Sequence, residues 1–234
     1  MGPPLRTFYG SSPLPARAVG NASGALNGPV AGIVARTPGA IANPARPAGA
    51  DTRVVMGAVA QPLDHGGAQL SLRAQIQSCI ETARADSASS WLMMVCGAHD
   101  FVLGGFPEDC LQEVFKDNPD VLIAGTLAPQ GKVTRAPGGW MLEGRWQFCS
   151  GVDHSPWLMF GALQADADTD PEPWGAVHLM VPKDQIEVID TWHVLGMRGT
   201  GSKDVVARQV FVPEHRSVAT PLLFTGRSPH ARAA

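Results

Sequence analysis

The hydrophobic positions change their period along the chain, from a helical period to a strand period. Between Gln69 and Pro119, apolar residues recur every three to four positions, which predicts helices. From Val121 onward, apolar and polar residues alternate, which predicts β-strands. Because the helices precede the strands instead of alternating with them, the pattern favours an α+β fold.

Three helices are expected. The first begins near Gln69, the second follows the capping pair Asp86-Ser87, and the third opens at Pro107. Asn118-Pro119 stops the third helix. The predicted buried positions are Leu72, Ile76, Cys79, Ile80 and Ala83 in the first helix, Trp91, Met94, Val95, Ala98 and Val102 in the second, and Leu111, Val114 and Phe115 in the third.

The clearest strand lies in Gly139–Ser150. Its alternation predicts one inner face, formed by Trp140, Leu142, Trp146, Phe148 and Ser150. Cys149 falls on the opposite face, where we expect an inert thiol. Further strands are expected at 157–163, 174–181, 185–190 and 203–212, and together they predict an antiparallel β region.

Residues 1–65 show no persistent period. The first fifty contain no Asp, Glu or Lys and are rich in Pro, Gly, Ala and Arg. This composition is typical of a disordered segment, and a transit peptide is the alternative. The chain is therefore expected to divide into a low-complexity segment (1–65), a helical domain (66–120), a β domain (121–216) and a tail (217–234).

Composition narrows the functional classes. The net charge of −3 gives no electrostatic case for a nucleic-acid partner, and no apolar stretch is long enough to cross a bilayer. No GxGxxG motif follows a strand, and no P-loop is present. The four cysteines form no CxxC pair, and Asp153-His154 lacks further ligands at a useful spacing. We therefore expect no metal site, and free thiols of a cytoplasmic protein.

Three segments, taken together, resemble one family. They are CGAHDFVLGGFP at Cys96–Pro107, GGWMLEGRWQFCSGVDH at Gly138–His154 and WHVLGMRGTGSKDVVARQVFVPEHR at Trp192–Arg216. In this order and spacing they resemble the oxygenase components of two-component aromatic hydroxylases. These group D flavin monooxygenases include the 4-hydroxyphenylacetate, secosteroid-phenol and indole-acetate hydroxylases.

The resemblance covers roughly residues 70 to 225. It implies the acyl-CoA dehydrogenase fold, with a partial N-terminal helical domain and a middle β-barrel that binds flavin. The family continues into a C-terminal four-helix bundle after the VPEHR string, and we expect this bundle to be missing from the chain.

The resemblance also implies roles for individual residues. A flavin needs a flat apolar slot with a few polar groups at its edge. His99 is expected to face a phenolic substrate, and Ser150 is expected to lie near flavin N5, so both are candidate catalytic residues. The expected cofactor contacts are Thr126, Trp146, Phe148, Ser150, Gly151, Arg198, Thr200 and Ser202.

Structural interpretations of the same residues stay open. For Ser150 the alternative is a strand-end serine bonded to backbone, and for Phe148 the alternative is a barrel core residue. His99 beside an apolar helix stripe is often structural, and Arg198 suits an exposed tight turn.

The function implied by the resemblance is a flavin-dependent monooxygenase. A separate flavin reductase would supply reduced FMN or FAD, and the enzyme would hydroxylate a small aromatic substrate with O2. Full-length family members are expected to be homotetramers. One alternative is an acyl-CoA dehydrogenase of the same fold, and another is an inactive remnant. The APQGK string at Ala128–Lys132 and the FCSG string at Phe148–Gly151 favour the hydroxylase.

Overall fold

Helices form the first part of the fold. The computed structural model describes residues 72–118, 121–165 and 175–225. Within them the three expected helices are α3 (Leu72–Ala83), α4 (Ser87–Leu103) and α5 (Glu108–Phe115). The disorder predicted for residues 1–65 lies outside the described residues.

The predicted starts of α4 and α5 are confirmed, whereas Gln69, the predicted start of the first helix, lies outside the described residues. The carboxylate of Asp86 accepts a hydrogen bond from the backbone N–H of Ser89 at 2.8 Å, which caps α4. Pro107 precedes α5, and Glu108 and Asp109 occupy its first turn, where they complement the helix dipole.

A seven-stranded sheet follows the helices, in the order β5-β6-β2-β1-β3-β4-β7. Its strands are β1 (Ile123–Ala136), β2 (Gly139–Cys149), β3 (Trp157–Gln164), β4 (Ala176–Pro182), β5 (Glu187–Ile189), β6 (Lys203–Pro213) and β7 (Ser217–Ala219), and the short helix α6 (Thr220–Phe224) follows β7. The segment expected to be a tail therefore contains a strand and a helix.

The expectation of a wholly antiparallel sheet is wrong at one pair. Strands β1 and β3 pair in parallel, whereas every other pair is antiparallel. The connection after β2 is short, and β3 runs in the direction opposite to β2. It pairs with β1 on the side away from β2, and β1 also runs opposite to β2, so β1 and β3 are parallel.

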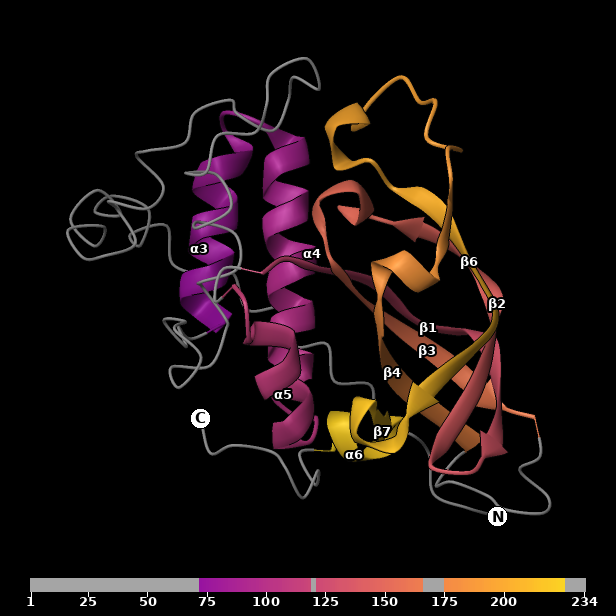
Figure 1. Cartoon of the computed structure of the whole chain (residues 1–234). Coiled ribbons are helices and arrows are strands. Elements are labelled where there is room, and N and C mark those ends of the chain that lie inside the picture. The colour runs from indigo at the N-terminus through magenta and orange to yellow at the C-terminus, as the bar shows by residue number, and fades with distance from the viewer. Residues whose placement is uncertain (1–71, 119–120, 166–174, 226–234) are drawn as a thin grey trace, which may run out of the picture.

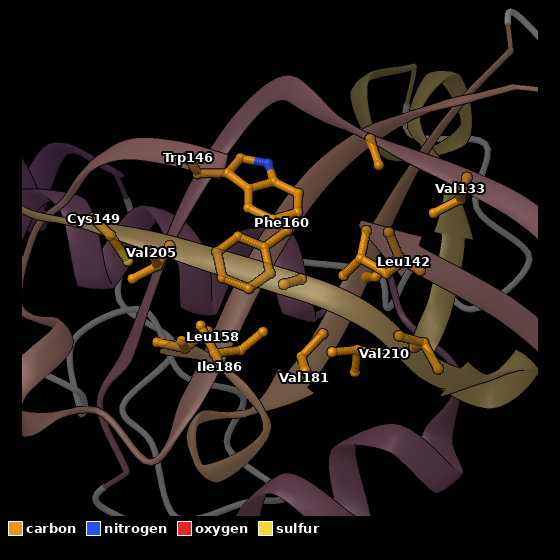
Figure 2. Packing of buried hydrophobic residues seen from close by; sticks show 14 of the residues in the cluster. Val133, Leu142, Trp146, Cys149, Leu158, Phe160, Val181, Ile186, Val205 and Val210 are labelled. Atoms are coloured by element: carbon orange, nitrogen blue, oxygen red, sulfur yellow. The ribbon is translucent and has the colours of Figure 1, made fainter. Parts of the chain in front are cut away.

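The sheet coils around one core. Side chains from β6 and β2 belong to the same buried cluster as side chains from β3 and β4 at the other end of the strand order. Trp146 lies inside this cluster, stacked on Phe160 with ring centroids 4.3 Å apart (Figure 2). Its indole N–H donates to the Gly161 carbonyl at 2.8 Å. Gly131 leaves room for this ring, because a Cβ there would lie 2.1 Å from the indole.

The three helices cover one side of the coiled sheet (Figure 1). Helix α4 contacts β1 and the short 3₁₀ helix η6 (Arg198–Thr200), and α3 packs on α4. Two side chain to backbone hydrogen bonds join α3 to α4, from Gln75 to the Met94 carbonyl and from Ser90 to the Cys79 carbonyl.

The predicted buried faces of α3 and α4 are wrong. In α3 the buried residues are Gln75 and Ser78, whereas Leu72, Ile76 and Ile80 are at least half exposed. Helix α3 turns its polar side to α4, because Gln75 reaches the α4 backbone across Gly97.

In α4, Trp91 and Met94 are exposed, and the buried positions include Leu92, Met93 and Cys96. Apolar residues surround most of α4, so their period does not select one face. In α5, by contrast, Leu111, Val114 and Phe115 are buried as predicted.

The alternation predicted along β2 is broken at its end. The pairing of β2 with β6 shifts register between Trp146 and Cys149. Phe148 consequently adopts φ 62° and is 64% exposed, whereas Cys149 points into the barrel core (Figure 2). The face-sharing prediction is therefore wrong for Phe148 and Cys149. Burial raises the pKa of the Cys149 thiol to about 12, so it stays protonated at neutral pH.

A carboxylate clamp holds α5 against the end of the barrel. Glu113 of α5 accepts hydrogen bonds from Arg216 Nε at 2.7 Å and from His215 Nε2 at 3.0 Å. Hydrogen bonding to Arg216 lowers the pKa of Glu113 to about 2. The last residues of the VPEHR string thus join the helical layer to the sheet.

We predict that Glu113→Gln lowers the urea midpoint of unfolding at pH 7. The folded-state pKa of Glu113 lies below its ordinary value of 4.5, so the charged clamp stabilises the fold above pH 4.5. This contribution is lost as pH falls toward 2, and the difference between the two proteins should shrink over that range. Glu187→Gln, which breaks an exposed ion pair with Arg208, is the control and should change little. A difference independent of pH would contradict the electrostatic origin of the clamp.

Candidate functional site

The candidate site lies at the rim of the barrel, where β2 ends beneath α4. Ser150 and Gly151 form the turn after β2, and Gly151 adopts φ 80°. Its backbone N–H donates to the Thr200 carbonyl at 2.9 Å. A Cβ at Gly151 would lie 3.3 Å from Leu92 of α4, so a glycine lets the helix approach the turn.

A continuous chain of hydrogen bonds runs through this turn. The indole N–H of Trp91 donates to Ser150 Oγ at 3.1 Å, and Ser150 Oγ lies 2.7 Å from Ser202 Oγ. Ser202 Oγ lies 2.7 Å from Thr200 Oγ1, which donates to the Met197 carbonyl at 2.9 Å. All three hydroxyl residues are buried. The structure thus brings Ser150 together with Thr200 and Ser202, which lie some fifty positions further along the sequence.

An exposed apolar surface adjoins these hydroxyls. The ring of Phe148 meets the ring of Trp192 edge to face, with centroids 6.1 Å apart. Leu195 and Met197 are exposed in the loop that leads to η6. Phe148 holds a left-handed backbone conformation, which costs a non-glycine residue about 1–3 kcal/mol. Strain of this kind, at an exposed aromatic residue beside buried hydroxyls, is typical of a ligand site.

The other predicted contacts occupy different positions around this rim. Arg198 is exposed at the start of η6, between the left-handed residues Met197 and Gly201. Thr126 Oγ1 donates to the Gln147 carbonyl at 3.3 Å, close to Phe148. Trp146 is fully buried and supports the rim from inside the barrel. Its predicted contact with a ligand stays a prediction, as do those of Thr126, Phe148, Gly151 and Arg198.

His99 lies two turns beyond Trp91 on α4, about 12 Å along the helix axis. It is 3% exposed, and its Nδ1 lies 2.9 Å from the Ile123 carbonyl. A carbonyl only accepts, so Nδ1 carries the proton and Nε2 of the neutral ring holds a lone pair. Burial lowers the pKa of His99 in spite of this hydrogen bond, so the neutral ring is favoured and its Nε2 can accept a hydrogen bond.

The neighbour of His99 on α4 is a buried carboxyl group. Asp100 is 1% exposed, and neither of its carboxyl oxygens has a hydrogen-bond partner within the described part of the chain. Burial raises the pKa of Asp100 well above its ordinary value, because the charged form is desolvated there. No cluster of three or more His, Cys, Asp or Glu able to hold a metal ion occurs among the described residues.

The sequence did not single out Trp91 as a site residue, nor the Met197 carbonyl. Trp91 was assigned to the buried face of its helix, yet it is 44% exposed and its indole reaches the rim. The Met197 carbonyl accepts from Trp192 Nε1, Thr200 N and Thr200 Oγ1. The sequence gives little indication of these contacts, because they depend on the left-handed backbone conformations of Met197 and Gly201.

The chain has clear relatives among known proteins, although no family model matches it. It is 35% identical to the oxygenase component of an FADH2-dependent resorcinol hydroxylase from a Rhizobium species, over 74% of this chain and 42% of the relative. It is 31% identical to the oxygenase subunit HsaA of a flavin-dependent monooxygenase from Mycobacterium tuberculosis, over 67% of this chain and 39% of that protein.

Solved structures agree with these relatives. The structure of XiaF from a Streptomyces species, in complex with FADH2, superposes with a TM-score of 0.71 at 30% identity, over 83% of this chain and 52% of that one. The fold is therefore the acyl-CoA-dehydrogenase-like fold of these oxygenases. This chain spans about 40% of the length of the curated relatives it matches.

We predict that His99 is neutral, with its proton on Nδ1, throughout the neutral pH range. Long-range ¹⁵N–¹H correlation spectra of the labelled protein should show this tautomer, and the ring should stay neutral below pH 6.5 because burial lowers its pKa. His99→Gln identifies the signal by its loss. A proton on Nε2 would show that the ring does not donate to Ile123, and titration near pH 6.5 would contradict the lowering of its pKa by burial.

Proposed function

Since this chain is a homologue of the oxygenase components of flavin-dependent aromatic hydroxylases, we propose that it forms the flavin-binding region of such a monooxygenase. The substrate is a small phenol or a related electron-rich ring. The net reaction consumes an aromatic C–H bond, O2 and reduced flavin, and it yields the hydroxylated ring, oxidised flavin and water. Reduced FMN or FAD supplies the two electrons that activate O2, and it comes from a separate flavin reductase.

The observation that carries this proposal is the Ser150 turn, where a buried hydroxyl adjoins an exposed aromatic surface. Ser150 Oγ has hydrogen bonds to Trp91 and Ser202 and retains one acceptor position. Phe148 and Trp192 provide apolar rings beside it, as a flat heterocycle requires. The arrangement fits a flavin, with Ser150 at its polar edge and Phe148 against its ring.

Two further residues fit the same cofactor, and a third fits the substrate. Arg198 is an exposed cation beside the Gly199 and Gly201 backbone, which suits the negatively charged part of a flavin nucleotide. Thr126 lies at the Phe148 end of the rim. His99 provides a neutral Nε2 that can accept a hydrogen bond from the hydroxyl of a phenol, which is the role we propose for it.

We further propose a homotetramer in the cytoplasm. The exposed apolar side chains of α3 and α4, including Leu72, Ile76 and Ile80, are consistent with a surface that other subunits cover. All four cysteines are free, which is usual in a reducing compartment. No helix in the described ranges is long and apolar enough to span a membrane.

We predict that the chain hydroxylates a phenol when it is supplied with a flavin reductase, NADH and flavin. With ¹⁸O2, mass spectrometry should detect one labelled oxygen atom in the product, because the hydroxyl oxygen comes from O2. Flavin binding without a labelled product would favour the alternative of an inactive remnant. Oxidised flavin that co-purifies in stoichiometric amount, together with oxidation of acyl-CoA, would favour a dehydrogenase. If neither FMN nor FAD binds in either redox state, the proposal is wrong.

We predict that Ser150→Ala raises the fraction of consumed NADH whose electrons reduce O2 to hydrogen peroxide instead of forming hydroxylated product. Loss of one hydrogen bond is worth about 1 kcal/mol, which corresponds to a several-fold change. Peroxide and hydroxylated product are measured together as a function of NADH consumed. Ser155→Ala is the matched control, because Ser155 is buried in the next turn and its hydroxyl donates to the Gly151 carbonyl. Equal coupling in Ser150→Ala and the unaltered protein would exclude a role for Ser150 at the reacting edge.

A further inference from the structure

We propose that Thr200 and Ser202 fix the direction in which the Ser150 hydroxyl donates its proton, and that this direction selects reduced flavin over oxidised flavin. The proposal rests on the proposed function and extends it. It assigns to two positioning residues the choice between the two redox states of the cofactor.

The two ends of the hydrogen-bond chain set its direction. The indole of Trp91 can only donate, and the Met197 carbonyl can only accept. Each hydroxyl between them has a single proton. When Thr200 donates to Met197, it is free to accept from Ser202, and Ser202 is free to accept from Ser150. Every proton in the chain then points toward the Met197 carbonyl.

This direction leaves Ser150 Oγ with one acceptor position and no proton to donate. The opposite direction is possible only if Thr200 turns its proton from the Met197 carbonyl toward Ser202. Ser150 would then accept from both Trp91 and Ser202 and donate outward, but the hydrogen bond from Thr200 to Met197 would be lost. The typical net worth of one such bond corresponds to roughly a fivefold difference in an equilibrium constant.

The redox states of a flavin differ in the same property. Reduced flavin carries a hydrogen on N5 and donates there, whereas N5 of oxidised flavin holds a lone pair and only accepts. A Ser150 that only accepts matches the reduced form. Binding of the oxidised form with a hydrogen bond from Ser150 requires the whole chain to reverse, at the cost of the Thr200 to Met197 bond.

The site is well suited to hold this direction. Thr200 is 2% exposed and Ser202 is 4% exposed, so few solvent molecules are available to compensate a lost partner. The Met197 carbonyl also accepts from Trp192 and from the Thr200 backbone, which keeps it in place to receive the Thr200 proton.

The test is Thr200→Val, which keeps the branched shape and removes the hydroxyl. The purified chain is titrated with oxidised FMN and FAD by fluorescence, and with dithionite-reduced FMN and FAD by anaerobic absorbance. The ratio of the two dissociation constants, oxidised over reduced, should fall roughly fivefold, because Ser202 loses the acceptor that held its proton away from Ser150. Thr200→Ser retains the hydroxyl and should keep the ratio of the unaltered chain.

Ser202→Ala gives a second measurement with the same expectation, since Ser150 then has no hydroxyl to which it can donate. If circular dichroism shows that Thr200→Val does not fold, the ratio of dissociation constants in Ser202→Ala tests the inference alone. Flavin binding with an unchanged ratio in both variants would overturn the inference and leave the proposed function standing. If neither FMN nor FAD binds to the unaltered chain in either redox state, the proposed function fails and the inference fails with it.

Discussion

The hydrogen bond between Trp91 and Ser150 joins the helical layer to the rim of the barrel, and the rest of the candidate site depends on it. It exists only because α4 can approach the turn after β2, where Gly151 leaves space for Leu92. The same approach places His99 of α4 against the Ile123 carbonyl at the start of β1. One helix thus positions two chemically different groups, and its distance from the sheet is set by a glycine.

The order and ends of the elements could be predicted from the sequence because they depend on local interactions. The Asp86 cap and the proline before α5 act within one turn, and the structure has both where the sequence indicated. The faces of α3 and α4 could not be predicted in this way. Which face is buried depends on the neighbouring element, and α3 meets α4 through Gln75 instead of through its apolar side chains.

The candidate site was predictable to the level of its motifs. The strings around Ser150 and Thr200 indicated both halves of the rim, and the structure brings them within hydrogen-bond distance through Ser202. Their orientation was not predictable, since a register shift near the end of β2 turns Phe148 outward and Cys149 inward. A period of two cannot reveal a bulge, because the bulge inserts a residue that the partner strand does not match.

The clamp between Glu113 and Arg216 has a consequence for the order in which the chain can assemble. Its two residues are 103 positions apart, and the strands from β1 to β6 lie between them. Closing so long a loop costs chain entropy, which only a formed barrel offsets by holding its ends together. During synthesis from the N-terminus, Glu113 of α5 can therefore pair with Arg216 only after nearly all of the sheet has emerged from the ribosome. Helix α5 is thus synthesised before the sheet, but its hydrogen bonds to Arg216 form after most of the sheet.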